Sequence, residues 1–211
     1  MALRVSELSR RSGVPLTTIK YYLREGLLPP GEARARNQAD YGADHLRRLR
    51  LIRVLREVGG LTLAKVKAVL DALDAPPADR HLLLGLVHQA LAPPPAPTAS
   101  AEELAAARSE VDRLIARLGW QVSPEAPART TLAAALAALR ALGLAEGAEV
   151  FAPYARTAEQ IAAFELGAVA ASAESADAVE LTVVGTVVFE AALSALRRLA
   201  QEHHSALLFR T

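Results

Sequence analysis

Residues 5–31 read VSELSRRSGVPLTTIKYYLREGLLPPG, and this stretch decides the fold of the N-terminal part of the chain. Ser6 is a good N-cap, which predicts a short first helix that begins there and ends at Gly13. Pro15 is tolerated in a first helical turn, so a second helix follows at once and ends near Gly26. Two short helices joined by a glycine-containing turn are typical of a helix-turn-helix.

The next segment interrupts the helical pattern. Residues 28–41 read LPPGEARARNQADY, in which prolines and a glycine precede a polar, basic stretch. We expect an extended hairpin, or wing, beside the second helix, with Arg34, Arg36 and Asn37 on it and Tyr41 at its end.

Two more helices are predicted after the wing. Apolar residues at helical spacing extend from about Ala43 to Val58, where Gly59 and Gly60 end the pattern. Thr62 then caps a fourth helix. The N-terminal 75 residues are therefore predicted to form a winged helix-turn-helix domain of four helices with a small β wing.

The charge is distributed unevenly along the chain. Residues 1–73 contain fourteen Lys and Arg against seven Asp and Glu, a net charge of +7, and the remainder carries −6. A basic head on an acidic body is the electrostatic layout of a nucleic-acid binder with a regulatory or assembly domain.

Composition excludes several other classes of protein. Hydrophobic residues make up 52% of the chain, which excludes a disordered protein, and no apolar run reaches the ~18 residues that span a bilayer. The N-terminus lacks the apolar middle of a signal peptide, so we expect a cytoplasmic protein with no membrane partner. The chain has no cysteine, and its five histidines show no metal-ligand spacing. We therefore expect no metal and no cofactor.

The quoted stretches, followed by HLRRLRLIRVLREVGGLTLAKVKAVL at residues 45–70, closely resemble the DNA-binding domain of MerR-type regulators over residues 3–73. The resemblance implies a bacterial transcription regulator that dimerises, binds an inverted-repeat promoter operator in double-stranded DNA and distorts the promoter, with RNA polymerase as a further partner. The second helix is expected in the major groove and the wing on flanking phosphates. The residues expected to touch DNA are Thr17, Thr18, Lys20, Tyr21, Arg24, Arg34, Arg36, Asn37 and Tyr41. Tyr41 either anchors the wing or touches a phosphate.

Beyond residue 75 the sequence predicts a mainly α body. Residues 76–122 are read as a linker with dimerisation helices, broken by a proline-rich run at 93–97. Ser100 and Glu103 form a capping box that starts a helix with an apolar seam of 3-4 spacing. That seam pairs with a second copy or packs within its own chain. Residues 123–211 are expected to form an all-helical C-terminal domain for assembly or effector binding, in which Thr131 opens one helix and Thr157 caps another. A β-branched run at 182–188 leaves a strand open there.

Aromatic residues of the body are candidates to line a pocket for a small organic effector. They are Trp120, Phe151, Tyr154, Phe164 and Phe189. The simpler interpretation is that they fill a helical core. We expect no enzyme, because no nucleophile with a base, phosphate-cradling loop or carboxylate cluster is apparent. The alternative to a regulator is a ligand-independent DNA-architectural or protein-interaction factor.

Overall fold

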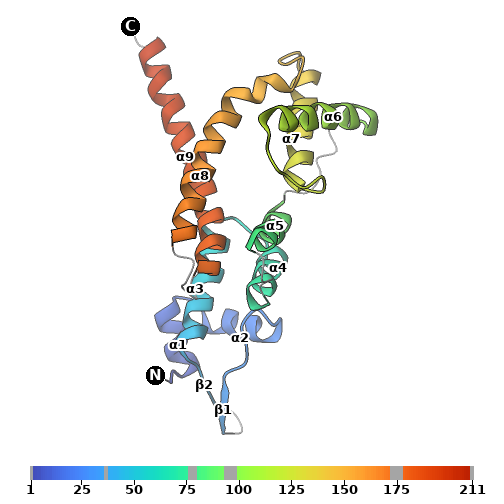
Figure 1. The fold of residues 1–211 in the computed structure, drawn as a ribbon. Coiled ribbons are helices and arrows are strands. Elements are labelled where there is room, and N and C mark those ends of the chain that lie inside the picture. The colour runs from blue at the N-terminus through green and yellow to red at the C-terminus, as the bar shows by residue number, and fades with distance from the viewer. Residues whose placement is uncertain (1, 36–37, 76–79, 93–98, 172–177, 210–211) are drawn as a thin grey trace. The chain divides into compact units, whose positions relative to one another are not determined.

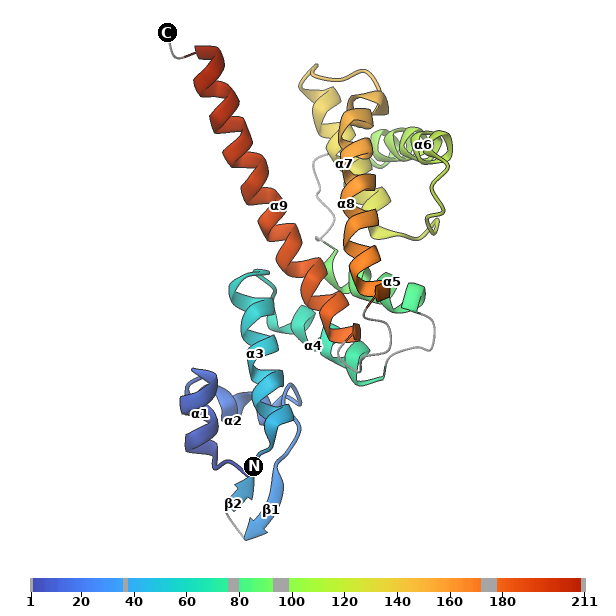
Figure 2. The same ribbon diagram turned by 60° about the vertical axis from the view of Figure 1, so that its left-hand side comes forward.

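The computed structural model describes residues 2–35, 38–75, 80–92, 99–171 and 178–209. The chain divides into two compact units, drawn in Figures 1 and 2. Residues 1–75 and 180–211 make up the first, here called the terminal unit. Residues 76–179 make up the second, the central unit.

The terminal unit starts with the predicted helix-turn-helix. Helix α1 spans Val5–Ser12 and α2 spans Leu16–Arg24, with Pro15 at the N-cap position of α2. The prediction that Ser6 caps α1 was wrong, because the helix begins one residue earlier and Arg4 is its N-cap.

The turn between α1 and α2 is held by its own polar groups. Gly13 adopts a left-handed conformation with φ of 69°, which an L side chain disfavours, and its N–H donates to the Ser9 carbonyl at 3.0 Å. The N–H of Val14 donates to the hydroxyl of buried Ser12 at 3.2 Å, and the Ser9 hydroxyl donates to the Val14 carbonyl at 2.6 Å. These bonds fix the angle at which α2 leaves α1.

The wing forms as predicted. Strands β1 (Glu32–Ala35) and β2 (Gln38–Asp40) pair antiparallel, with Glu32 opposite Asp40. Residues Arg36 and Asn37 at its tip lie outside the described residues. An isolated bridge between Leu3 and Tyr41 joins the base of the wing to the segment before α1.

Helices α3 (Ala43–Glu57) and α4 (Leu63–Asp74) complete the domain. Thr62 caps α4 as predicted, accepting a bond from the Lys65 N–H at 3.4 Å. Val58, predicted to lie inside, is 48% exposed because α3 ends at Glu57. The core is formed by fully buried side chains from all four helices: Leu8, Ile19, Leu49, Ile52, Leu55, Val66, Val69 and Leu70.

The long helix α9 (Ala178–Phe209) packs its first turns on this domain. Both views show its base at the end of α3 (Figures 1 and 2). Val183 and Val187 are 0% and 3% exposed. Gly59 makes the contact possible, since a Cβ there would lie 2.3 Å from a methyl of Val187 and 2.7 Å from the Leu55 carbonyl oxygen. The run 182–188 is thus helical rather than a strand.

Gly59→Ala is expected to destabilise the terminal unit by about 1–3 kcal/mol, because the added methyl overlaps both Val187 and backbone. Thermal unfolding followed by circular dichroism measures the change. Gly185→Ala, on α9, is the control: its Cβ would meet Phe189 only at 3.6 Å, an ordinary contact. A Gly59→Ala protein as stable as the control would contradict close packing of α9 on α3.

The described residues of the central unit form helices and the loops that connect them, with no strand among them. The unit contains α5 (Arg80–Leu91), α6 (Ala101–Leu118), α7 (Pro127–Ala141), a 3-10 turn η1 (Ala148–Phe151) and α8 (Ala152–Ala171). The capping box at the start of α6 is confirmed: the Ser100 N–H donates to the Glu103 carboxylate at 2.8 Å, and the Glu103 N–H to the Ser100 hydroxyl at 3.2 Å.

Two helix starts in this unit differ from the sequence prediction. Thr131 was expected to open α7, which instead begins four residues earlier with Pro127 in its first turn. Thr157 was expected to cap a helix but lies inside α8, where its hydroxyl donates to the Pro153 carbonyl at 3.2 Å. A threonine that bonds back along its own helix does not mark a helix end.

The apolar seam of α6 packs within the chain. Its residues join those of α7 in one buried cluster, which includes Ala107, Val111, Leu114, Ile115, Ala133, Leu136 and Ala137. Of the two interpretations of the seam, this arrangement corresponds to packing within its own chain. The expected grouping of residues 123–211 also differs from the observed one, because α9 belongs to the terminal unit and α7 and α8 to the central unit.

A charged network at one end of the α6–α7 pair braces the loop between the two helices. Arg129 is 11% exposed and bonds to Asp112 at 2.5 Å and to the carbonyls of Val122 and Ser123 at 2.7 and 2.9 Å. Arg108 also bonds to Asp112, at 3.3 Å. Hydrogen bonding from Arg129, and then from Arg108, lowers the pKa of Asp112 below its ordinary value.

We expect this pair to make the central unit sensitive to acid. Because the pKa of Asp112 is lowered on folding, its contribution is present above the unfolded pKa, near 4, and is lost as the pH falls through the folded value. Asp112→Asn should therefore be less stable than the wild type at pH 7, and the difference should shrink below about pH 4. Urea unfolding at several pH values measures it, with exposed Glu159→Gln on α8 as the control. A difference independent of pH would contradict the role of the ionised carboxylate.

Candidate nucleic-acid interface

Helix α2 divides cleanly into a buried face and an exposed face. Ile19 and Tyr22 point into the core and are 0% and 6% exposed. The outward face is made by residues at i, i+3, i+4 and i+7, which share one side of a helix. They are Thr17, Lys20, Tyr21 and Arg24. Four of the residues predicted to touch DNA are thus brought together, while Thr18 lies half-buried at the margin.

Two of these side chains hold each other. The Arg24 guanidinium carbon lies 5.3 Å from the centroid of the Tyr21 ring, a cation–π distance. Arg24 also contacts Glu25 at 3.3 Å. Both contacts keep the Arg24 charge beside the Tyr21 ring at the end of α2, while Lys20, one turn earlier, is exposed.

The base of the wing carries a second group of charges. Arg34 on β1 is 62% exposed and lies 3.6 Å from the Asp40 carboxylate. Arg4 lies 3.8 Å from the same carboxylate and donates to the Gln38 side chain at 2.6 Å. Arg4 was not among the residues predicted for this interface. Its place in the extended segment just before α1 is the signal that could have indicated it.

Tyr41 anchors the wing, one of the two roles considered for it. It is 6% exposed, exchanges backbone hydrogen bonds of 2.8 and 2.9 Å with Leu3, and stands edge-on to His45 with ring centroids 5.1 Å apart. Burial raises its pKa above the ordinary value.

Two arginines of α3 link helices. Arg48 donates to the Leu27 carbonyl at 2.6 Å and makes a bidentate pair with Asp74 at 2.5 and 2.7 Å. Arg53 donates to the Ser12 carbonyl at 3.1 Å and also pairs with Glu57. Arg48 therefore joins the segment after α2 to the end of α4, and Arg53 joins the end of α1 to α3.

Arg48→Ala should lower the stability of the terminal unit by about 1–3 kcal/mol, because a carbonyl and a carboxylate lose a charged partner. Arg50→Ala removes the same charge from an exposed position of the same helix and should change stability by less than ~0.5 kcal/mol. Chemical denaturation of both proteins checks this. Equal effects of the two substitutions would show that Arg48 does not brace the domain.

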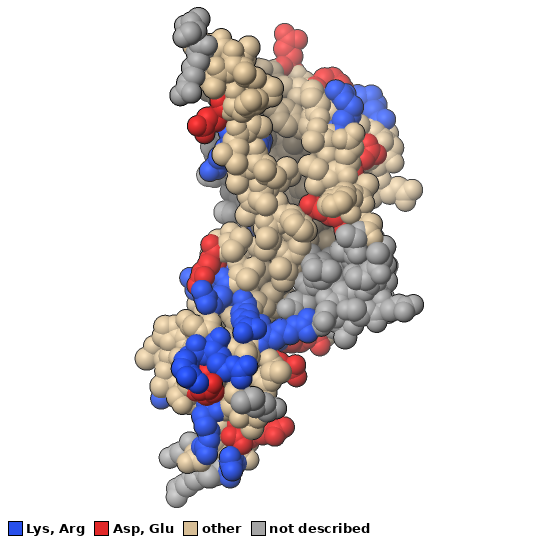
Figure 3. Space-filling model, turned by 90° about the vertical axis from the view of Figure 1, so that its left-hand side faces the viewer, with Lys and Arg blue, Asp and Glu red and all other residues tan. Residues whose placement is uncertain are grey.

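The basic side chains of the terminal unit form a visible group. Figure 3 shows Lys and Arg gathered on one face of its lower part, with acidic side chains beside and between them. Such a group attracts polyanions, because phosphate contacts act collectively and release counterions.

The aromatic residues proposed for an effector pocket lie in different local surroundings. Trp120 and Phe151 pack against the α6–α7 core, which agrees with the simpler interpretation for these two. Tyr154 and Phe164 on α8 are 58% and 77% exposed. Phe189 is 50% exposed and lies on α9, in the terminal unit.

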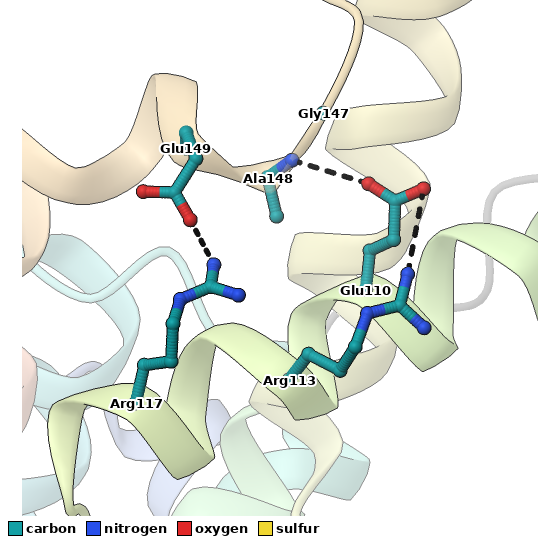
Figure 4. Close-up of a pocket in the computed structure, with 6 residues that line it drawn as sticks. All are labelled: Glu110, Arg113, Arg117, Gly147, Ala148 and Glu149. Atoms are coloured by element: carbon teal, nitrogen blue, oxygen red, sulfur yellow. Dashed lines mark hydrogen bonds and ion pairs between the residues drawn. The ribbon is translucent and has the colours of Figure 1, made fainter.

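Two hollows of the central unit have other linings. One, of about 220 Å³, is drawn in Figure 4; its charged side chains pair with one another, Arg117 with Glu149 and Arg113 with Glu110 at 3.8 Å. Arg140 and the Ala148 N–H also bond to Glu110, and hydrogen bonding from Arg140 is the main cause that lowers its pKa. The other, of about 300 Å³, is mainly apolar and lies between α6 and α7, with Leu104, Arg108 and Thr130 in its wall.

Membrane-spanning helices and metal-binding clusters are both absent from the described ranges. No helix within them has the length and apolar character required to cross a membrane. No group of three His, Asp or Glu side chains among the same residues is placed to hold a metal ion.

The chain is similar to known proteins over its N-terminal domain and, in one case, over nearly its whole length. Residues 3–73 match the model of the MerR HTH family regulatory proteins. Over 73 residues the chain is 30% identical to the HTH-type transcriptional regulator ZntR homolog of Haemophilus influenzae, and over 74 residues it is 34% identical to the mercuric resistance operon regulatory protein of Bacillus cereus. Each match covers 35% of this chain and 53% or 55% of the relative, so the chain spans about half the length of these curated relatives.

A solved structure matches nearly the whole chain. It is SCO5550 from Streptomyces coelicolor A3(2), described as a transcriptional regulator, with 43% sequence identity and a TM-score of 0.74. The match covers 98% of both chains. The similarity therefore includes the central unit and α9, which the shorter relatives do not match.

Proposed function

Residues 3–73 belong to the MerR family of helix-turn-helix regulatory proteins, and we propose that the chain is a transcription regulator that reads DNA through α2 and the wing. The observation that carries the proposal is the exposed face of α2. A threonine, a lysine and an arginine are exposed there beside half-buried Tyr21, while Ile19 and Tyr22 on the opposite side are buried.

Each group on that face has a chemical use in the major groove. Thr17 offers a methyl and a hydroxyl to base edges, and Lys20 reaches guanine acceptors or a phosphate. Tyr21 and Arg24, held against one another, suit the phosphate backbone. Arg34 on the wing, with Arg36 and Asn37 at its tip, is proposed for flanking phosphates or the minor groove.

We propose that the regulator acts as a homodimer on an inverted repeat, since paired half-sites require paired readers. Distortion of promoter DNA, with RNA polymerase as a further partner, is the regulatory step proposed from the family, whether it activates or represses. Thiolate coordination of a metal is not available to this chain, because it contains no cysteine. The mercury response in the name of the Bacillus relative is therefore not transferred.

An organic effector is proposed to bind in the central unit. The apolar hollow between α6 and α7 is its candidate site, at the lower end of the size range of ligand pockets. Effector would raise the unfolding temperature of this unit progressively as its concentration increases above the Kd. The ligand-independent architectural factor is the alternative function and requires no such site.

Footprinting on the promoter region of the chain's own gene tests the function. The wild type should protect an inverted repeat and bind scrambled DNA at least ~10³-fold more weakly. Lys20→Ala should weaken specific binding about 10- to 100-fold at constant salt, without a change in thermal stability, because its side chain is exposed.

Arg113→Ala is the matched control, since it removes one exposed positive charge from the central unit. It should bind the operator within about twofold of the wild type. Equal affinity for operator and scrambled DNA would favour the architectural alternative. No binding to either would refute the proposal.

A further inference from the structure

The hollow between α6 and α7 has an apolar body and one polar end. Four residues of its wall stand at i, i+3, i+4 and i+7 of α6, so they form one strip that is about 10 Å long at 1.5 Å per residue. They are Ala101, Leu104, Ala105 and Arg108. Thr130 and Ala133, three residues apart on α7, complete the described wall. Its two polar side chains lie together, because Arg108 donates to the Thr130 hydroxyl at 2.9 Å.

The Arg108 guanidinium is held in place by its own chain. Its Nε donates to Asp112 at 3.3 Å, and one terminal nitrogen donates to the Pro124 carbonyl. With the bond to Thr130, three of its five N–H groups are used, and the other two have no acceptor among the residues that the structure describes. The side chain is 29% exposed, so a solute can still reach it. A guanidinium that is already fixed loses little entropy when it binds a further acceptor.

The Thr130 hydroxyl adds a second donor at the same end. It accepts the bond from Arg108, and within the described part of the chain its own proton is not donated to any group. The polar end of the hollow therefore offers donors, and the ligand group that completes it is an acceptor. An ammonium group would bring further donors and a charge that Arg108 repels.

The surrounding charges favour an anionic acceptor. Asp112 is the carboxylate bonded to Arg108, but it lies closer to Arg129, at 2.5 Å, so two guanidiniums share one carboxylate. Exposed Glu125 is the other acidic neighbour; its pKa is lowered mainly by hydrogen bonding from Ser123 and only then by the charges of Arg129 and Arg108. Water screens such an exposed charge. Because charge-assisted hydrogen bonds are about twice as strong as neutral ones, a carboxylate suits this end better than an amide carbonyl.

The volume of the hollow limits the size of the ligand. It is about 300 Å³, and since a cavity of about 150 Å³ holds benzene, an apolar body of roughly 10–12 carbons fits. We propose that this hollow binds an apolar monocarboxylate of about that size, with its carboxylate on Arg108 and Thr130 and its body along Ala101, Leu104 and Ala105. Only the role of this ligand as an effector rests on the proposed function; the binding itself does not.

Calorimetric titration of the full chain without DNA tests the ligand class. The three probes share one ring system: 1-naphthoate, its neutral amide 1-naphthamide, and the cation 1-naphthylmethylammonium. At pH 7 the naphthoate should bind with a Kd below about 1 mM. The amide should bind at least ~10-fold more weakly. The cation should give no binding over the same concentrations.

Two alanines of α6 test the location. Ala105→Leu places three more carbons in the hollow and should raise the Kd of 1-naphthoate at least ~10-fold. Ala106→Leu makes the same change one residue along, outside the wall, and should leave the Kd within about twofold. Both positions are exposed and leucine suits a helix, so both variants should fold, which far-UV circular dichroism checks.

The polar end is tested by the preference for the anion. Thr130→Val keeps the volume, removes one donor and should raise the Kd of 1-naphthoate about 3- to 10-fold. Arg108→Gln should reduce the preference for 1-naphthoate over 1-naphthamide to within about twofold. This ratio compares two probes on the same protein, so a purely structural role of Arg108 would leave it unchanged.

Absence of naphthoate binding, or an amide or cation that binds as tightly, would overturn the proposed ligand class. Equal effects of Ala105→Leu and Ala106→Leu would overturn the location. Because DNA is absent, a chain that binds 1-naphthoate but protects no operator refutes the proposed function and not this site. A chain that protects its operator and does not bind 1-naphthoate does the reverse.

Discussion

The nine residues of α2 must bury one side of the helix in the domain and leave the other side turned outward. The arrangement of the terminal unit depends on how they do both. Burial of Ile19 and Tyr22 in the domain fixes the rotation of the helix about its own axis. Once that rotation is fixed, the outward face is determined, because residues three and four apart share a side. The turn before α2 is held by the hydroxyls of Ser9 and Ser12 and by the Arg53 guanidinium. The orientation of α2 is therefore set by contacts within the domain and not by the side chains of its outward face.

The features that could be predicted from sequence are those set by local chemistry. Gly13 ends a helix because of its left-handed backbone, Thr62 and Ser100 cap helices with their own side chains, and the wing follows from a proline-glycine break. The outward face of α2 was predicted for the same reason. Its residues are neighbours in sequence, and their spacing alone puts them on one side.

The features that were missed depend on contacts between distant segments. Nothing near Gly59 indicates that a helix more than a hundred residues later packs on it. The apolar seam of α6 has the pattern of a coiled coil, yet α7 covers it, and pattern alone does not distinguish a partner in the same chain from one in another copy. Spacing in the sequence also does not indicate which aromatic residues of the body are covered: Trp120 and Phe151 pack in the α6–α7 core, whereas Tyr154 and Phe164 of α8 are exposed.

The return of α9 to the N-terminal domain has a consequence for the order in which the protein folds. The helix-turn-helix, wing and α4 lie within residues 1–75, whereas the helix that covers the end of α3 is synthesised more than a hundred residues later. On the ribosome, the apolar surface around Gly59 must therefore wait while the whole central unit emerges and folds. Closing so long a loop costs only slightly more than closing a short one, since each doubling adds about 0.6 kcal/mol. The late docking of α9 therefore slows folding but costs little of the final stability. Until α9 docks, the surface that later receives Val183 and Val187 is exposed to incorrect partners.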